Sequence, residues 1–204
     1  MKIGVFALQG AFIEHEHAFE KLGVETVEIR RRAHFSDGFD GIVLPGGEST
    51  VQGKLLREEG LLEPVQEAIK SGLPVFGTCA GLILLANELT NDSNVYFGTM
   101  DVTVKRNAYG RQLGSFRADL KFKGIGIYPA VFIRAPYIEK AEKDVEVLAE
   151  CDGKIVAARQ KNMLATAFHP ELTDDLRIHS YFLNMIKGEV SEKSTTHTHE
   201  SNSI

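Results

Sequence analysis

The 204-residue sequence has little cysteine, no tryptophan and no long hydrophobic run. Cysteine occurs only as Cys79 and Cys151, which excludes a disulfide framework and favours a reducing, cytoplasmic setting in which one thiol can act as a nucleophile. No apolar run approaches the ~20 residues that a membrane helix needs. The short apolar stretch at the N-terminus is followed at once by polar and charged residues, so we expect a first strand there rather than a signal peptide.

Positive charge is also scarce. Lysine and arginine number 23 against 28 aspartates and glutamates, which gives a formal charge of −5. Such a chain lacks the basic surface that nonspecific nucleic-acid binding requires, although local arginines could still hold a small anionic substrate. The hydrophobic content of 43% and the charged content of 25% are those of an ordinary globular protein of one domain.

Short apolar runs alternate with helical patterns through the first half of the chain, and strands and turns follow after residue 100. The alternation predicts an α/β domain with a mostly parallel central sheet and flanking helices, with extra strands in the second half. We expect strands at 2–8, 25–29, 41–44, 73–76, 101–106, 115–122, 131–134, 145–149, 154–159 and 164–168. We expect helices at 12–22, 49–71 (interrupted near Gly60), 81–89 and 174–187.

The C-terminal segment differs in composition from the rest. Residues 188–204 are rich in Ser, Thr, Glu and His and contain almost nothing to bury. We therefore predict one domain over residues 1–187 and a disordered tail over residues 188–204.

A strand meets a helix at the segment Gly77-Thr78-Cys79-Ala80-Gly81. This pattern resembles a nucleophile elbow, in which a sharp turn between small residues exposes one side chain. The start of a helix also favours a thiolate and can stabilise an oxyanion. A free cysteine is often just a small core residue. The flanking glycines at a strand–helix junction favour Cys79 as a nucleophile.

A thiol nucleophile needs a base, and the base needs an orienting group. His169 follows the expected strand 164–168 and precedes Pro170, which keeps it extended. Residues two apart in an extended segment face the same side, so Glu171 can accept a hydrogen bond from His169. A single histidine is more often a surface or capping residue. His169 is nonetheless the candidate base, because the other six histidines lack such a pairing.

A glycine pair follows the expected strand 41–44, in the segment Pro45-Gly46-Gly47-Glu48-Ser49. Glycines let the backbone approach a ligand and present N–H groups to it, but the same pattern can be a plain turn before a capped helix. Arg106 and Arg134 each end an expected strand and could pair with a substrate carboxylate, although arginines at strand ends are often merely solvated. We predict no metal site and no bound cofactor.

Together, the segments around Cys79 and His169 resemble the Cys-His-Glu triad of the class I glutamine amidotransferases. Further motifs resemble the glutaminase subunits of pyridoxal 5'-phosphate synthases within that class. These motifs are Ala7-Leu8-Gln9-Gly10, Leu44-Pro45-Gly46-Gly47-Glu48-Ser49-Thr50, Arg106-Asn107-x-x-Gly110-Arg111-Gln112 and Phe132-Ile133-Arg134-Ala135-Pro136. The resemblance covers residues 1 to about 187. It implies a flavodoxin-like α/β fold.

The resemblance also implies an activity. Cys79 would attack the side-chain amide of L-glutamine, with His169 as base and then acid and Glu171 orienting His169, to give a thioester, ammonia and finally L-glutamate. The implied substrate-binding residues are Gly47, Glu48, Ser49, Arg106, Ile133 and Arg134. The implied oxyanion hole consists of the backbone N–H groups of Gly47 and Ala80.

A partner is implied as well. The ammonia would pass to a pyridoxal 5'-phosphate synthase subunit in a hetero-oligomeric complex, for vitamin B6 biosynthesis, with Gln9 and Gly46 coupled to the partner. Two alternatives stay open at this point. One is an intracellular cysteine peptidase or related hydrolase that acts alone, and the other is a catalytically idle binding subunit, which would not require Cys79, His169 and Glu171 together.

Overall fold

The computed structural model describes residues 1–90, 92–106 and 114–190. Residues 107–113, which include the motif positions Asn107, Gly110, Arg111 and Gln112, lie outside the described residues, as does the predicted tail from residue 191. Gly188 and Glu189 still donate backbone hydrogen bonds to Met185 and Asn184, and the half-buried Val190 packs against the core. The described chain therefore continues just beyond the predicted end of the domain.

The core of the molecule is a ten-stranded sheet with the order β2-β1-β3-β4-β12-β11-β9-β6-β5, in which β10 pairs with β11. Its parallel part consists of β2 (Glu25–Ile29), β1 (Lys2–Phe6), β3 (Gly41–Leu44), β4 (Val75–Thr78) and β12 (Met163–Thr166). The residues of β3 and β4 are all buried. Continuous apolar burial is typical of parallel strands that are covered on both faces.

The rest of the sheet is mostly antiparallel and comes from the second half of the chain. It contains β5 (Ala86–Leu89), β6 (Met100–Lys105), β9 (Tyr137–Ala141), β10 (Glu146–Cys151) and β11 (Lys154–Gln160). The β10–β11 pair is a hairpin that turns at Asp152 and Gly153, both at positive φ. A separate two-stranded sheet is made by β7 (Ser115–Phe122) and β8 (Gly126–Ile133).

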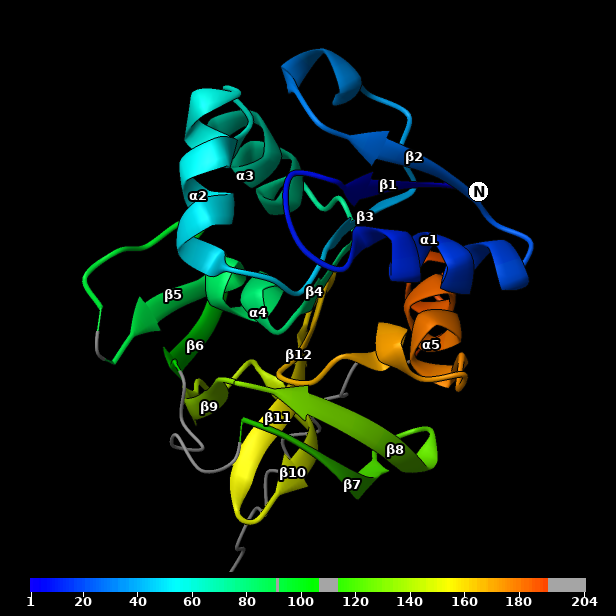
Figure 1. Ribbon diagram of the computed structural model, residues 1–204, viewed down its shortest axis with the longest axis vertical. Coiled ribbons are helices and arrows are strands. Elements are labelled where there is room, and N and C mark those ends of the chain that lie inside the picture. Colours follow the sequence, from blue (N-terminus) through cyan, green and yellow to red (C-terminus); the bar gives the residue numbers. More distant parts are fainter. Residues whose placement is uncertain (91, 107–113, 191–204) are drawn as a thin grey trace, which may run out of the picture.

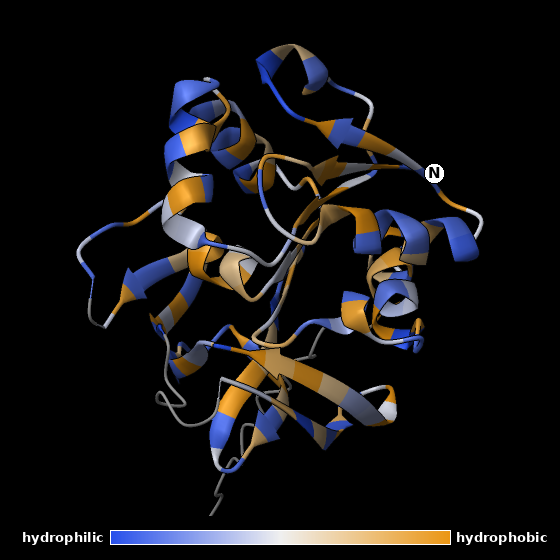
Figure 2. Cartoon of the chain, viewed as in Figure 1, coloured by the Kyte–Doolittle hydropathy of each residue, from blue (hydrophilic) through white to orange (hydrophobic). Residues whose placement is uncertain are grey.

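Helices cover both faces of the parallel strands. α1 (Phe12–Lys21) and α5 (Arg177–Ile186) lie on one side, and α2 (Ser49–Glu58) and α3 (Leu62–Lys70) lie on the other, as Figure 1 shows. α4 (Ala80–Leu85) is a short helix after β4, and Arg32–His34 (η1) and Pro170–Leu172 (η2) are single 3-10 turns. Figure 2 shows hydrophobic and hydrophilic residues together on α1 and α2, as expected of helices that cover a sheet with one face.

The predicted fold class is confirmed: the chain is an α/β domain with a mostly parallel central sheet, flanking helices and extra strands from its second half. The predicted interruption near Gly60 is also present, because Gly60 has a φ of +64° between α2 and α3. The predicted helix over 81–89 is wrong in its second half. The chain leaves the helix at Ala86, and 86–89 pairs in parallel with β6.

The loops at one edge of the sheet come together from four strands. β1 leads to Gln9, β3 leads to Gly46, β4 leads to Cys79 and β12 leads to His169. All four strands are parallel, so their carboxyl ends meet at the same edge. This edge is where parallel α/β sheets usually bind their ligands.

Candidate active site

Cys79 occupies a strained turn between β4 and α4. Its backbone has a φ of +48° and a ψ of −96°, a conformation that costs a non-glycine residue about 1–3 kcal/mol. The turn is close-packed, because a Cβ on Gly77 would lie 2.7 Å from the carbonyl carbon of Gly81, and a Cβ on Gly81 would lie 2.2 Å from the carbonyl oxygen of Leu44. The two flanking glycines therefore make this turn possible.

His169 and Glu171 form a buried pair. Nδ1 of His169 lies 2.8 Å from Oε1 of Glu171, and each residue is only 6% exposed. The predicted contact is present, but not through the predicted backbone. Glu171 lies in the 3-10 turn η2, whereas an extended segment was expected. The tight turn, with Pro170 at its start, brings the carboxylate back toward the ring.

The protonation of His169 follows from its neighbours. Burial alone would lower the pKa of His169, but its hydrogen bonds with Cys79 and Glu171 outweigh burial and raise the pKa to about 10. At neutral pH the ring therefore carries a proton on both nitrogens. One proton faces Glu171 and the other faces the sulfur of Cys79. A cysteine sulfur beside a protonated imidazole is the arrangement found in cysteine nucleophiles.

A cavity of about 240 Å³ opens beside these groups. It is lined by Gln9, Gly47, Glu48, Ser49, Cys79, Ile83, Arg106, Ile133, Arg134 and His169. All six predicted substrate-binding residues thus lie around one space together with the candidate nucleophile and base. Ile83 was not predicted, because it is one of several apolar residues in the short helix after Cys79. Sγ of Cys79 lies 3.9 Å from the carbonyl oxygen of Ile133.

Both cavity arginines contact carboxylates. Nη1 of Arg106 lies 2.7 Å from Oδ2 of Asp92, and both side chains are largely buried. Nη2 of Arg134 lies 3.6 Å from Oε1 of Glu48, and this pair is largely exposed, so it contributes little to stability. Arg134 itself has a φ of +41° directly after β8. The cavity therefore presents cationic groups that a bound carboxylate could contact.

The glycine pair makes close backbone contacts. The carbonyl of Gly46 accepts a hydrogen bond from the amide of Ala11 at 2.9 Å. Gly10 lies so close that a Cβ there, at its φ of +106°, would be 1.9 Å from this carbonyl oxygen. A Cβ on Gly46 would lie 2.2 Å from Cε1 of His169. Positions 10 and 46 therefore require glycine, and the loop that contains Gly46 packs directly against His169, the candidate base.

The side chain of Gln9 connects the loop to the first strand. Its Oε1 accepts a hydrogen bond from the amide of Glu48 at 2.8 Å, and its carbonyl accepts one from Gln52 at 2.8 Å. Ala80 opens α4, so its amide is among the N–H groups that a helix start leaves without an intrahelical partner. Gln9 lines the cavity, while Gly46 and Ala80 are the direct chain neighbours of the lining residues Gly47 and Cys79.

Two buried histidines next to Glu171 were not predicted. His15 and His179 are both fully buried, and Nε2 of His15 lies 3.5 Å from Oε2 of Glu171. The available signal was the position of His15 on the apolar face of the helix expected at 12–22. A polar residue on a buried face must find a partner. The sequence pattern does not indicate which partner that would be.

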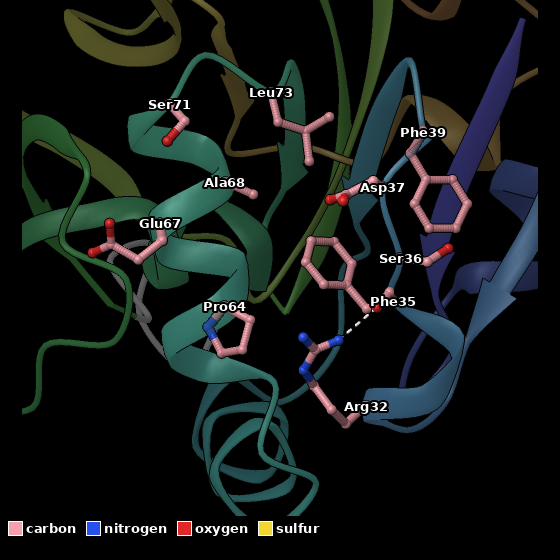
Figure 3. Close-up of a pocket in the computed structure, with 11 residues that line it drawn as sticks. Arg32, Phe35, Ser36, Asp37, Phe39, Pro64, Glu67, Ala68, Ser71 and Leu73 are labelled. Atoms are coloured by element: carbon pink, nitrogen blue, oxygen red, sulfur yellow. Dashed lines mark hydrogen bonds between the residues drawn. The ribbon is translucent and has the colours of Figure 1, made fainter.

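A larger open pocket, of about 730 Å³, lies at the opposite edge of the sheet (Figure 3). It is lined by residues that precede β3, such as Phe35 and Asp37, and by residues of α3, such as Glu67. The guanidinium of Arg32 donates to the carbonyl of Phe35 there. The residues that line this pocket include no cysteine or histidine. Cys79, the candidate nucleophile, lines the smaller cavity instead.

Side chains that bind metal ions do not gather anywhere in the described part of the chain. Within 1–90, 92–106 and 114–190, no group of three His, Cys, Asp or Glu side chains could hold a metal ion. In the same ranges, no helix has the length and apolar character needed to cross a membrane.

The model of the SNO glutamine amidotransferase family matches residues 5–188. The chain belongs to this family. The match spans the loop after β1, the glycine pair, the Cys79 turn and the segment after β12. The resemblance to the glutamine amidotransferases is therefore confirmed, and with it the class of enzyme.

Close relatives carry a common name. A protein of Streptococcus pneumoniae (strain CGSP14), named pyridoxal 5'-phosphate synthase subunit PdxT, is 57% identical over 190 residues, which cover 92% of this chain and 98% of the relative. A protein of the same name from Haemophilus influenzae (strain PittEE) is 58% identical over 191 residues, which cover 92% of this chain and 99% of the relative. These identities and coverages confirm the resemblance to the glutaminase subunits of pyridoxal 5'-phosphate synthases.

Solved structures agree with the fold. The crystal structure of a glutamine amidotransferase has a TM-score of 0.87 at 45% identity, over 91% of this chain and 98% of that chain. The crystal structure of a different glutamine amidotransferase, from Thermotoga maritima, has a TM-score of 0.61 at 13% identity, over 94% of this chain and 86% of that chain. The second likeness concerns the fold alone.

Proposed function

We propose that this glutamine amidotransferase hydrolyses L-glutamine to L-glutamate and ammonia, and delivers the ammonia to a synthase subunit that makes pyridoxal 5'-phosphate. The family and the PdxT relatives support the reaction and the partner. The observation that carries the proposal is one arrangement of side chains: Cys79 and His169 face one cavity, and Glu171 contacts His169 from behind.

In the first half of the reaction, the Cys79 thiolate attacks the side-chain amide carbon of glutamine. The carbonyl π electrons move onto oxygen, which gives a tetrahedral oxyanion. When this intermediate collapses, His169 transfers a proton to the amide nitrogen, and ammonia leaves. A thioester between Cys79 and the glutamyl group remains. Glu171 holds the imidazole with its other nitrogen toward the sulfur throughout.

In the second half, water replaces ammonia. His169 is now neutral and takes a proton from the water, which attacks the thioester carbon. Collapse of the second oxyanion releases L-glutamate and restores the Cys79 thiolate and the protonated His169. The overall change is one water consumed for each glutamine that is converted to glutamate and ammonia.

Backbone amides stabilise both oxyanions. The N–H groups of Gly47 and Ala80 are the proposed donors, since Gly47 lines the cavity and Ala80 follows Cys79 at the start of α4. A single donor of this kind typically contributes roughly 10²–10³ in rate. Gly47, Glu48, Ser49 and the main chain around Ile133 hold the rest of the substrate. Its α-carboxylate pairs with Arg106 or Arg134, in place of a present carboxylate contact.

The surface around the cavity fits a protein partner. Ile13 on α1, Val51 on α2 and Ile133 beside the cavity are large hydrophobic side chains that are 36–49% exposed. Ile13 and Val51 lie in the first turns after the Gln9 and Glu48 segments. A partner protein that covers Ile13 and Val51 would therefore contact the segments next to Gly46 and Gly47. The two free, buried cysteines suit a cytoplasmic complex.

The decisive experiment removes the nucleophile. Cys79→Ala should abolish release of glutamate and ammonia while the thermal unfolding midpoint stays close to that of the wild type, because alanine fits the turn. A glutamine-like electrophile should label Cys79. Cys151→Ala is the matched control: Cys151 is also buried and free, and burial raises the pKa of its thiol. Labelling at Cys151, or turnover by Cys79→Ala, would overturn the assignment.

Delivery of ammonia has its own readout. Glutamine with a heavy nitrogen isotope in its amide should transfer that isotope to the product of the synthase subunit. Exchange with unlabelled free ammonia in the medium should be small. Complete dilution by the medium would leave glutamine hydrolysis intact but remove delivery from the proposal.

A further inference from the structure

A chain of polar groups extends from Glu171 into the core, away from the cavity. His15 on α1 and His179 on α5 are fully buried, and Nδ1 of His15 lies 3.0 Å from Nε2 of His179. Nε2 of His15 lies 3.2 Å from Oγ1 of Thr78 and 3.5 Å from Oε2 of Glu171. The rings of Phe19 and Phe76 pack against the His179 ring at interplanar angles of 80° and 81°. Two histidines are thus enclosed between apolar rings and a carboxylate.

Both rings are neutral. Burial lowers the pKa of His15 well below 6.5, and the neighbouring His179 and His169 lower it further. Burial also lowers the pKa of His179 to about 4. A neutral imidazole has one N–H donor and one nitrogen that only accepts. Each ring therefore exists in one of two tautomers, and the neighbours decide which one.

The contacts at both ends select the same pair of tautomers. Nδ1 of His179 is buried and has no hydrogen-bond partner within the described residues. A buried N–H without a partner is rarer and more costly than a bare acceptor, so the proton of His179 belongs on Nε2, where it points to Nδ1 of His15. The proton of His15 is then on Nε2. The alternative would place a nitrogen lone pair of His15 against the oxygen of Glu171.

Thr78 fits the same scheme. Its hydroxyl can accept two hydrogen bonds and donate one. It accepts from the amide of Gly46 at 2.9 Å and faces the Nε2–H of His15 at 3.2 Å, which leaves its own proton for Oε1 of Glu171 at 3.4 Å. The remaining carboxylate oxygen, Oε2, is buried and has no full hydrogen bond within the described part of the chain. It faces Nε2 of His15 at 3.5 Å, so the single Nε2–H of His15 is shared between Oγ1 of Thr78 and Oε2 of Glu171.

We propose that His15, held in one tautomer by His179, is a positioning residue that fixes the carboxylate of Glu171 at Oε2 while Oε1 faces His169. The role rests on the proposed glutamine hydrolysis, since Glu171 matters there only through His169. Without His15, Oε2 of this buried carboxylate no longer faces an N–H group, and the carboxylate can turn. His169 then loses its fixed orientation toward Cys79.

The test compares two substitutions of His15. His15→Leu removes the N–H donor and puts an apolar side chain in the place of the imidazole. His15→Gln keeps an N–H donor near the position of Nε2. With the synthase subunit present, His15→Leu should lower kcat for glutamine roughly 10- to 100-fold with little change in KM, the range for a hydrogen bond to a charged group. His15→Gln should recover most of that loss. His17→Leu on the exposed side of the same helix is the matched control.

A second readout separates positioning from folding. The alkaline limb of kcat/KM reports the pKa of His169 in the free enzyme. His15→Leu should move this limb to lower pH, in the same direction as Glu171→Gln. A role in folding alone would lower the amplitude and leave the limb in place. Such a result, or a limb that moves equally in His15→Gln and His15→Leu, would overturn the proposal.

A double-mutant cycle tests whether the two residues act together. If His15 acts through Glu171, then His15→Leu should have little further effect on kcat in a Glu171→Gln background. Fully additive losses would contradict the proposal. Failure of the proposed function looks different, because it would appear as turnover by Cys79→Ala whatever residue occupies position 15.

Discussion

The amide nitrogen of Gly46 lies 2.9 Å from Oγ1 of Thr78, the residue that precedes Cys79. The same hydroxyl is 3.4 Å from Oε1 of Glu171, the oxygen that contacts His169. One buried side chain thus contacts both the glycine pair and the carboxylate behind the base. A displacement of the loop can therefore reach His169, the candidate base, through Thr78 and Glu171.

Thr78→Val tests this connection. Valine has the same shape but lacks the hydroxyl, so the amide of Gly46 and an oxygen of Glu171 each lose a partner. We expect kcat for glutamine to fall about tenfold or more, with little change in KM, since two hydrogen bonds of roughly 1 kcal/mol each are lost. Thr78→Ser should keep most of the activity. Equal activity in Thr78→Val and the wild type would show that the hydroxyl is not needed.

The roles of His169 and Glu171 differ in kind. His169→Ala removes the group that carries protons, whereas Glu171→Gln removes only a charge and keeps the size of the side chain. We expect Glu171→Gln to reduce kcat less than His169→Ala does, because an orienting group is lost and the proton carrier remains. Steady-state turnover of glutamine measures both. Equal and complete loss in both variants would mean that Glu171 has another task.

Much of the fold could be predicted from the sequence, because parallel strands that are buried on both faces have continuous apolar runs. The strand at 41–44 is recognisable for this reason. The error at 86–89 has a physical cause as well. The helix after Cys79 is apolar on all sides, so its periodicity does not show where the helix ends and β5 begins. β9 was missed, since its five residues, Tyr137–Ala141, do not alternate between apolar and polar side chains.

The candidate site was predictable where chemistry is encoded in short segments. The surroundings of Cys79 and the His169–Glu171 pair are of this kind. His15 and His179 belong to helices at opposite ends of the sequence, and their contact depends on how α1 and α5 pack. The ion pair of Arg106 with Asp92 likewise depends on the sheet. Such partners are set by tertiary packing, which a local pattern does not contain.

The buried histidines make stability depend on pH. The pKa of His179 is about 4 in the folded chain and near 6.5 when unfolded, so the unfolded state binds the extra proton as the pH falls between these values. Stability that is present above pH 6.5 is therefore lost toward pH 4, by up to roughly 3 kcal/mol. The wild type should lose stability faster on acidification than His179→Phe. Denaturant unfolding at a series of pH values measures the difference, and parallel curves would contradict it.

His169 makes the folding stability depend on pH in the opposite direction. Its pKa is raised to about 10, so its contribution is fully present below pH 6.5 and is lost as the pH rises toward 10. His169→Ala should flatten this alkaline limb of the same unfolding series. An unchanged limb would show that the ring is not held in its charged form.

The tail stays a prediction from composition. Removing residues 191–204 should leave turnover and the unfolding midpoint unchanged, because this segment has few residues to bury. Removing residues 188–190 as well deletes the half-buried Val190, whose carbonyl oxygen lies 3.5 Å from Nη1 of Arg159. We expect a small drop in the unfolding midpoint from that second truncation only. Loss of activity in the first truncation would show that the tail has a task.

Activity should depend on the synthase partner, through the peptide between Gly46 and Gly47. The carbonyl of Gly46 is held by the amide of Ala11 at the start of α1, and in a trans peptide the N–H of Gly47 points the other way. The direction of this N–H, one of the two proposed oxyanion donors, is therefore set by α1. Glycine reaches both signs of φ at little cost, so the peptide can turn over.

A partner that covers the exposed Ile13 on α1 would fix the start of that helix, and with it the peptide. We expect the purified chain alone to turn over glutamine slowly and the synthase subunit to raise kcat by roughly 10²–10³, the contribution of one oxyanion donor. Ile13→Asp should weaken this activation and leave the basal rate unchanged, because the residue faces solvent and lies outside the cavity. Glu63→Lys, on α3, is a surface control of altered charge away from the cavity. Full activity of the isolated chain, unchanged by the partner, would remove the switch, since the donor would then already be in place.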